Sequence, residues 1–170
     1  MRDDSQRWAP PRDRGVEVTA PGITIRSLDI ARLTLISGPA ALNATKLALA
    51  DWPGVVEGDS YAISLRRDRI LEVNGPARSD GWDADQNLAV SDVTDAYTHV
   101  EITGPAALPL LNRGTELDPN NPSRSAARLL FEMGVFLYRH GHSDTYRIHA
   151  GSAQDEALWQ ALTDAAKHLT

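Results

Sequence analysis

The sequence predicts an α+β fold of two pseudo-repeated β-β-α-β-β units, with mixed or antiparallel sheets and helices on one face. The first observation is a repeat: residues 36–42 return as residues 102–108, each time as Ile, then Ser or Thr, then Gly-Pro-Ala-Ala-Leu. The second is the alternation of apolar and polar residues in short runs such as residues 61–66. The third is a closing stretch, residues 158–169, whose leucines and alanines share one helical face.

The repeated segment has the composition of a strand-to-helix corner. Ser37 and Thr103 end the strands, and Gly38 and Gly104 allow the backbone to turn sharply. The proline that follows suits the first helical position, where its missing N–H costs nothing. A phosphate-binding loop would need further glycines, or Lys and Ser or Thr at set spacing, and the sequence lacks both. The motif therefore predicts equivalent corners in two duplicated units, with the two glycines at matching positions.

The first unit follows a polar N-terminal stretch. Residues 1–20 are expected to form an extended arm. Within it, Trp8 either anchors a partner surface or folds back onto its own domain. The expected strands are residues 23–26, 31–36, 61–66 and 69–73, and the expected helix is residues 39–50. The last two strands form a hairpin across Arg67-Asp68, and residues 77–86 are expected to link the two halves.

The second unit has a longer set of elements. The expected strands are residues 88–93, 96–103, 126–131, 135–139 and 145–149, and the first expected helix is residues 105–112. Ser152 is the expected N-cap of the closing helix, with Asp155 at the third helical position as a capping-box variant. We therefore expect a single α+β domain over residues 21–170, with related halves at about 21–76 and 88–170.

Composition excludes several classes of protein. The 170 residues carry a formal net charge of −6, which offers no broad basic surface to nucleic acid. The chain has no cysteine, so disulfides, zinc–thiolate sites, iron–sulfur clusters and thiol catalysis are excluded. No apolar run approaches the roughly 18 residues of a membrane span, and residues 1–7 lead into no apolar segment of a secretory signal. We expect a cytoplasmic protein.

The most chemical-looking cluster is His140-Gly141-His142-Ser143-Asp144. Alternate histidines can bind a metal ion, and a neighbouring Asp can orient one of them. The same residues are also ordinary hairpin-loop composition. Because the sequence nominates no third ligand, the loop interpretation is favoured over a metal site.

Other polar clusters have simpler explanations. One hairpin tip carries Arg66, Arg67 and Arg69. Three arginines could bind an anion, although such a tip is usually only exposed to solvent. Paired carboxylates lie in turn-like segments, where Asp commonly accepts backbone hydrogen bonds: Asp83 with Asp85, and Asp92 with Asp95. The repeat also aligns Asp29 with Asp95, as expected of a shared bend between strands. No catalytic, cofactor-binding or metal-binding residue is assigned, so an interaction or structural subunit is favoured over an autonomous enzyme.

The C-terminal half carries a family resemblance. Its segments are Ile-Thr-Gly-Pro-Ala-Ala-Leu-Pro-Leu-Leu-Asn-Arg-Gly-Thr-Glu-Leu-Asp (residues 102–118), Ser-Ala-Ala-Arg-Leu (125–129), Gly-Val-Phe-Leu-Tyr-Arg (134–139) and Leu-Trp-Gln-Ala-Leu-Thr-Asp-Ala-Ala (158–166). This order resembles the gamma subunit of heterotetrameric sarcosine oxidase, a family similar to the folate-binding domains of aminomethyltransferases. Two features depart from it: a short segment between Gly75 and Leu88, and Ala127 where a polar or basic residue is common.

The resemblance implies a non-catalytic small subunit of a complex that oxidatively demethylates sarcosine or another N-methyl amino acid, releasing hydrogen peroxide. It implies an alpha-type partner with a folate-binding domain, together with beta- and delta-type partners. It places FAD, FMN, NAD, zinc and tetrahydrofolate on those partners, with no cofactor on this chain. The alternative is a stand-alone folate-binding or one-carbon-transfer protein of the aminomethyltransferase type.

Overall fold

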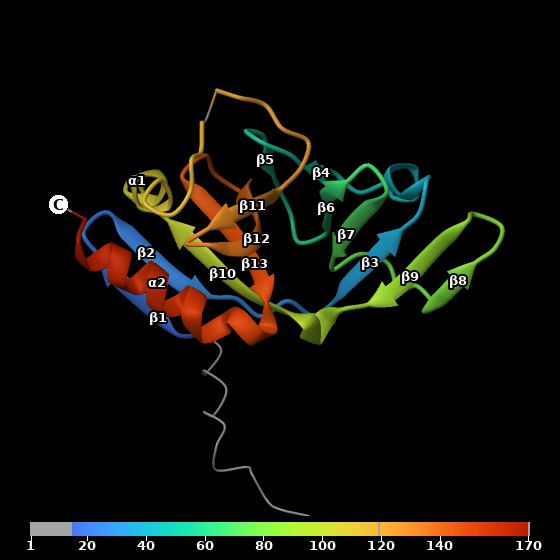
Figure 1. Ribbon diagram of the computed structural model, residues 1–170, viewed down its shortest axis with the longest axis horizontal. Coiled ribbons are helices and arrows are strands. Elements are labelled where there is room, and N and C mark those ends of the chain that lie inside the picture. Colours follow the sequence, from blue (N-terminus) through green and yellow to red (C-terminus); the bar gives the residue numbers. More distant parts are fainter. Residues whose placement is uncertain (1–14, 119, 170) are drawn as a thin grey trace, which may run out of the picture.

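Two β-sheets lie side by side in the computed structural model, which describes residues 15–118 and 120–169 (Figure 1). The strands of the seven-stranded sheet are, in spatial order, β1 (Glu17–Ala20), β2 (Ile23–Ser27), β10 (Tyr97–Thr103), β13 (Thr145–Gly151), β12 (Met133–His140) and β11 (Ala127–Leu130), with β5 (Val55–Val56) parallel to β12. Those of the six-stranded sheet are β4 (Leu49–Ala50), β6 (Tyr61–Arg66), β7 (Arg69–Val73), β3 (Leu33–Ser37), β9 (Leu88–Asp92) and β8 (Gly81–Asp83). Nearly all strand pairs are antiparallel, as the α+β prediction required.

Helices cover one face of the seven-stranded sheet. Ile25, Ile102 and Ile148 on three neighbouring strands are fully buried there, and Leu158 and Leu162 of α2 (Asp155–Lys167) belong to the same core. Each such side chain contributes roughly 1.5–3 kcal/mol through burial. The short α1 (Ala107–Leu111) joins this core as well. No helix of the described residues is long and apolar enough to cross a bilayer.

On the opposite face of the seven-stranded sheet, the alternate side chains of β2, β10 and β13 are mostly polar. Part of this face meets the six-stranded sheet: Tyr138 of β12 lies in one core with Tyr61, Ile63 and Leu71. The far face of the six-stranded sheet is closed by a smaller core that includes Ile36. The molecule is therefore layered as helices, seven-stranded sheet and six-stranded sheet.

The expected halves, residues 21–76 and 88–170, do not correspond to the two sheets. β2 belongs to the seven-stranded sheet although it precedes β3, and β9 belongs to the six-stranded sheet although it follows the expected linker. The chain crosses between sheets after each of these strands, near Asp29 and through the 3-10 turn Thr94–Ala96, which holds Asp95. Local sequence could not reveal this arrangement, because it depends on which distant strand each hairpin meets.

The two glycine corners are alike locally. Gly38 follows β3 with φ +150°, and Gly104 follows β10 with φ +119°. A Cβ at either position would overlap a carbonyl oxygen of the hairpin turn beside it, that of Asn87 or of Gly22. Both positions therefore need glycine for the same reason. Duplication as the origin of this likeness stays a prediction.

The helix expected over residues 39–50 is wrong. The chain makes only a 3-10 turn, Ala41–Asn43, and residues Leu49–Ala50 then pair as a parallel strand with β6. Ala and Leu favour helix in isolation, but strand pairing and burial of Ala50 override that weak preference.

The expected cap of the closing helix is also wrong. Ser152 begins a 3-10 turn, Ser152–Gln154, and α2 starts at Asp155 with no side-chain capping bond. Asp155 instead accepts a hydrogen bond from the hydroxyl of Thr98 on β10. Asp155 thus links the start of α2 to the sheet.

Two irregular segments expected from sequence are shorter than predicted. Part of the expected arm, Glu17–Ala20, forms β1 and pairs with β2, while Trp8 lies outside the described residues. Part of the expected linker, Gly81–Asp83, forms β8 and pairs with β9. Both segments are edge strands, and in each the alternation of apolar and polar residues covers only a few residues and buries one face at most. The hairpin of β6 and β7 has the predicted bounds.

Candidate functional site

A chain of hydrogen bonds runs between the two sheets. Arg147 Nη1 donates to Tyr61 Oη over 3.0 Å, and Tyr61 Oη lies 2.7 Å from Tyr138 Oη. Tyr138 Oη lies 2.5 Å from His149 Nε2, and the Nδ1 atoms of His149 and His99 are 2.9 Å apart. The two tyrosines are fully buried, and His149 is 1% exposed. Five polar side chains from β6, β10, β12 and β13 thus form one connected network.

One assignment of the hydrogens gives every bond in this chain a donor and an acceptor. Tyr61 Oη accepts from Arg147, which carries only donors, and in this assignment its own hydrogen goes to Tyr138. Tyr138 then donates to His149 Nε2, and His149 donates through Nδ1 to His99. In this assignment both imidazoles are neutral, with the His99 proton on Nε2. A proton added to His149 would place two donors face to face.

Burial reinforces this assignment. It lowers the pKa of His149 well below its usual range, and His99 and Arg147 add to the shift. Burial also raises the pKa of the Tyr138 hydroxyl well above its usual range, with a further contribution from Tyr61. Tyr138 and His149 are therefore both neutral near pH 7. Because the arginine stays charged, the chain cannot pass a proton out through it, and its effect is to hold the guanidinium in place.

The same arginine shares a carboxylate with a second one. Glu101 accepts from Arg147 Nε over 2.9 Å and from Arg26 Nη2 over 2.5 Å. Burial alone would raise the pKa of Glu101, but the hydrogen bonds from Arg147 and Arg26 outweigh it and lower the pKa. The Glu101 side chain is 5% exposed and the Arg147 side chain 16%. Two cations therefore meet one buried, ionised carboxylate.

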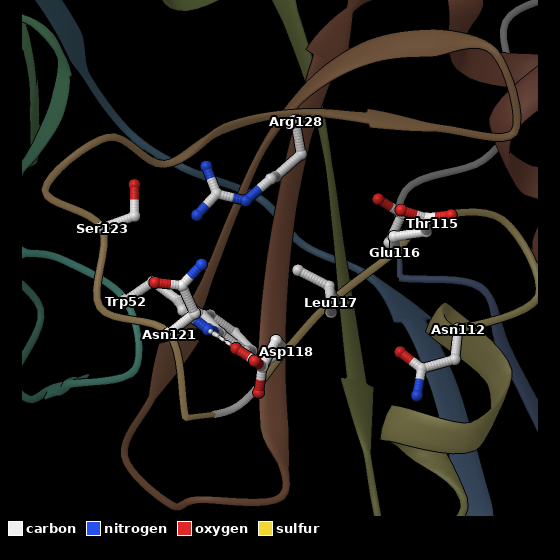
Figure 2. A pocket seen from close by; sticks show the side chains of 9 residues that line it. All are labelled: Trp52, Asn112, Thr115, Glu116, Leu117, Asp118, Asn121, Ser123 and Arg128. Carbon is white, nitrogen blue, oxygen red and sulfur yellow. Dashed lines mark hydrogen bonds between the residues drawn. The ribbon is translucent and has the colours of Figure 1, made fainter.

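A separate pocket of about 690 Å³ opens beside the loop between α1 and β11. Its lining residues are Trp52, Asn112, Thr115, Glu116, Leu117, Asp118, Asn121, Ser123 and Arg128 (Figure 2). Trp52 is buried and donates through Nε1 to the carbonyl oxygen of Asp118, and Arg139 stacks on its ring at 4.8 Å. Figure 2 shows the Arg128 side chain reaching across the opening from β11. Trp52 and Leu117 are the buried apolar residues of the lining, and the other lining residues are polar or charged.

The histidine loop does not assemble a metal site among the described residues, where no group of three or more His, Asp, Glu or Cys side chains could hold an ion. His140 Nε2 lies 2.8 Å from the carbonyl oxygen of Gly58, and its ring packs against Tyr61. Burial lowers the pKa of His140. Gly141 has φ +73°, as the loop interpretation expects of a turn between β12 and β13.

The arginine tip and the carboxylate pairs lie apart from the buried network. Arg66 is 62% exposed and 3.7 Å from Asp68, so its ion pair is a surface contact. Asp83 accepts backbone hydrogen bonds within the β8–β9 turn. Asp92 accepts from Thr94, whose side-chain and backbone hydrogen bonds lower the pKa of this carboxyl. These carboxylates shape turns, as their sequence context indicated.

Sequence reasoning missed the buried network and the tryptophan pocket. The sequence does contain one pattern that could have indicated the network: polar residues recur at every second position of three strands. These residues are His99, Glu101 and Thr103; Thr145, Arg147 and His149; and Thr24 and Arg26. Such a period marks one shared polar face. The strand order that brings the faces together is not visible in the sequence.

Comparisons with known proteins support the fold. No protein-family model matches the sequence, and no curated protein matches it either. A solved structure, heterotetrameric sarcosine oxidase from Corynebacterium sp. U-96 in complex with pyrrole 2-carboxylate, contains a chain that matches with a TM-score of 0.65 and 20% identity. The match covers 88% of this chain and 86% of that chain, so the two are similar in length. The resemblance to a subunit of heterotetrameric sarcosine oxidase is thereby confirmed as a likeness of fold along nearly the whole chain.

Proposed function

We propose that this chain is a non-catalytic, gamma-type small subunit of a heteromeric flavoenzyme that oxidatively demethylates sarcosine or another N-methyl amino acid. The observation that carries the proposal is the match over 88% of this chain to one chain of a heterotetrameric sarcosine oxidase of similar length. In this proposal the alpha-type subunit with its folate-binding domain is the direct partner, and beta- and delta-type subunits complete the complex. FAD, FMN, NAD, zinc and tetrahydrofolate are assigned to the partners.

Exposed apolar side chains at the sheet edges support a role in assembly. Trp82 is 63% exposed on β8, an edge strand of the six-stranded sheet, and Leu129 is 67% exposed on β11, an edge strand of the other. A short edge strand offers unpaired backbone groups to a partner, and large exposed apolar side chains are common anchors of interfaces. These two positions are therefore the first candidates for contact with a larger subunit.

Co-expression with the large flavoprotein subunits from neighbouring genes tests the proposal. The tagged chain should retain a flavin-containing partner through affinity and size-exclusion steps, and the complex should release hydrogen peroxide from sarcosine or a related N-methyl amino acid. Trp82→Ser and Leu129→Ser should each reduce the retained flavin absorbance, while Glu156→Ser on the exposed side of α2 should not. A chain that always elutes alone, without any flavoprotein, would refute the proposal.

The alternative, a stand-alone folate-binding or one-carbon-transfer protein, is favoured by one observation. The pocket beside Trp52 and Leu117, of about 690 Å³, has the size range of small-molecule sites. Calorimetry of the isolated chain with tetrahydrofolate distinguishes the two functions. Saturable heat that Trp52→Ala abolishes would support this alternative, and absence of heat would remove it.

A further inference from the structure

Four charged residues form one row across the polar face of the seven-stranded sheet. The strand register places Glu17 opposite Arg26, Arg26 opposite Glu101, and Glu101 opposite Arg147. These residues come from β1, β2, β10 and β13, and their signs alternate along the row. Tyr138 of β12 continues it and begins the part of the face that the six-stranded sheet covers. The charged row is therefore the boundary between the covered and the open part of this face.

A pocket of about 540 Å³ lies over the open part. Its lining residues are Glu17, Thr24, Arg26, Glu101, Thr103, His140, Gly141, His142, Thr145 and Arg147. The three threonines form the next row of the same face, since Thr103 pairs with both Thr24 and Thr145. The pocket thus has a floor of paired charges, a row of hydroxyl groups and a wall from the turn between β12 and β13. We refer to it as the polar-face pocket.

At the floor of the pocket, two guanidinium groups share one buried carboxylate. Glu101 receives three hydrogen bonds from two guanidinium groups, those of Arg26 and Arg147. Glu17, at the end of the row, is exposed and makes no ion pair with the described residues. Over the whole row two carboxylates match two guanidinium groups, but at Glu101 one buried negative charge faces two positive charges.

Each guanidinium also keeps donors to spare. Arg26 uses Nε and Nη2, and Arg147 uses Nε and Nη1, so Arg26 Nη1 and Arg147 Nη2 make no hydrogen bond to another described residue. The Arg147 guanidinium is held from both sides, by Glu101 and by Tyr61. Since its position is already fixed, a ligand would lose little side-chain freedom by binding to it.

We propose that the polar-face pocket binds a small oxyanion, a carboxylate or a phosphate group, between Arg26 and Arg147. Planar guanidinium forks match both kinds of oxyanion, and their hydrogen bonds are charge-assisted. The hydroxyl groups of Thr24, Thr103 and Thr145 would donate to the remaining oxygens. The site belongs to this chain itself and goes beyond its proposed role as a subunit, so it stands or falls independently of any partner.

Backbone amide NMR of the isolated chain tests the site, with inorganic phosphate and acetate as probes and chloride as the reference at equal ionic strength. Saturable shifts should appear in β2, β10 and β13 near Arg26, Glu101 and Arg147. Arg26→Gln should weaken binding at least about tenfold, the loss of one charge-assisted contact. Arg26→Lys keeps the charge but loses the fork, and should weaken binding less. Arg66→Gln, an exposed arginine on the other sheet, is the matched control and should leave binding unchanged.

The outcomes separate clearly. Saturation with acetate alone assigns a carboxylate ligand, saturation with phosphate alone assigns a phosphate group, and saturation with both supports the common oxyanion site. Shifts that fail to saturate by about 50 mM, or that match those of chloride, overturn the proposal, because a useful site for such groups should bind in the millimolar range or tighter. Equal weakening by Arg66→Gln and Arg26→Gln would also overturn it, since that result would mean only screening of the overall charge.

Discussion

The hydroxyl of Tyr138 should be worth several kcal/mol to the folded state. It is hydrogen-bonded to Tyr61 and to His149, at 2.7 and 2.5 Å, where all three side chains are at most 1% exposed. Tyr138→Phe would leave both Tyr61 Oη and His149 Nε2 without this hydrogen-bond partner. Each buried unsatisfied group costs about 1–3 kcal/mol. Because the new ring no longer has to desolvate a hydroxyl, we expect a net loss of about 2–4 kcal/mol.

Urea unfolding at a fixed pH near 8 measures this loss, with Tyr97→Phe as the matched control. Tyr97 is a partly buried tyrosine whose hydroxyl makes no hydrogen bond to a described residue. Its replacement should change the free energy of unfolding by less than about 1 kcal/mol. The slope of the unfolding curve should be unchanged in both variants. If Tyr138→Phe cost no more than Tyr97→Phe, the directional hydrogen-bond chain would be refuted.

Three further predictions concern buried or crowded positions, each measured by urea unfolding. Because burial lowers the pKa of His149, the unfolded chain takes up a proton below pH about 6.5 that the folded chain does not. The free energy of unfolding should therefore fall by up to about 1.4 kcal/mol per pH unit as the pH drops. His149→Gln should reduce that slope, and an unchanged slope would contradict the assignment of His149 as neutral. Gly104→Ala should lower the free energy of unfolding by more than about 2 kcal/mol, because φ is +119° and a Cβ would overlap a carbonyl oxygen. Gly134→Ala is the control: it has open space around it and should stay within about 1 kcal/mol of the parent. Equal losses in the two variants would argue against the close approach at Gly104. Glu72→Ala should cost about 2–4 kcal/mol, because it leaves Arg78, 24% exposed, without its fully buried partner; a loss below about 1 kcal/mol would show that water replaces the carboxylate.

Strands with strong alternation were predictable, whereas weakly patterned segments were not. Tyr61–Arg66 and Arg69–Val73 have the predicted bounds because apolar residues alternate on both sides of a two-residue turn. The helix predicted from Pro39 to Ala50 is wrong because it rests on alanine and leucine, which favour helix in isolation. In the structure this segment makes one 3-10 turn and a short strand. The edge strands β1 and β8 fall where the sequence predicts an extended arm and a linker, because few of their residues are buried and their apolar pattern is weak.

The candidate sites were harder to predict than the elements. The His140–His142 loop is a candidate metal site by sequence because its histidines are close together in the chain. In the structure, His140 lies against the backbone carbonyl of Gly58. The residues that do meet, Tyr61, Tyr138 and His149, come from three separate strands. Proximity in sequence was therefore a poor guide to proximity in space for this chain.

The sequence by itself determined the α+β class, the two glycine corners and the amphipathic closing helix, because each depends on the conformational preferences of neighbouring residues. Only the tertiary structure decided which sheet each hairpin joins, and hence which polar residues share a face. The row from Glu17 to Arg147 exists because four strands align at one register. A shift of one residue in any of them would turn its charge toward the apolar core. That register is set by packing between distant segments, which local preferences do not encode.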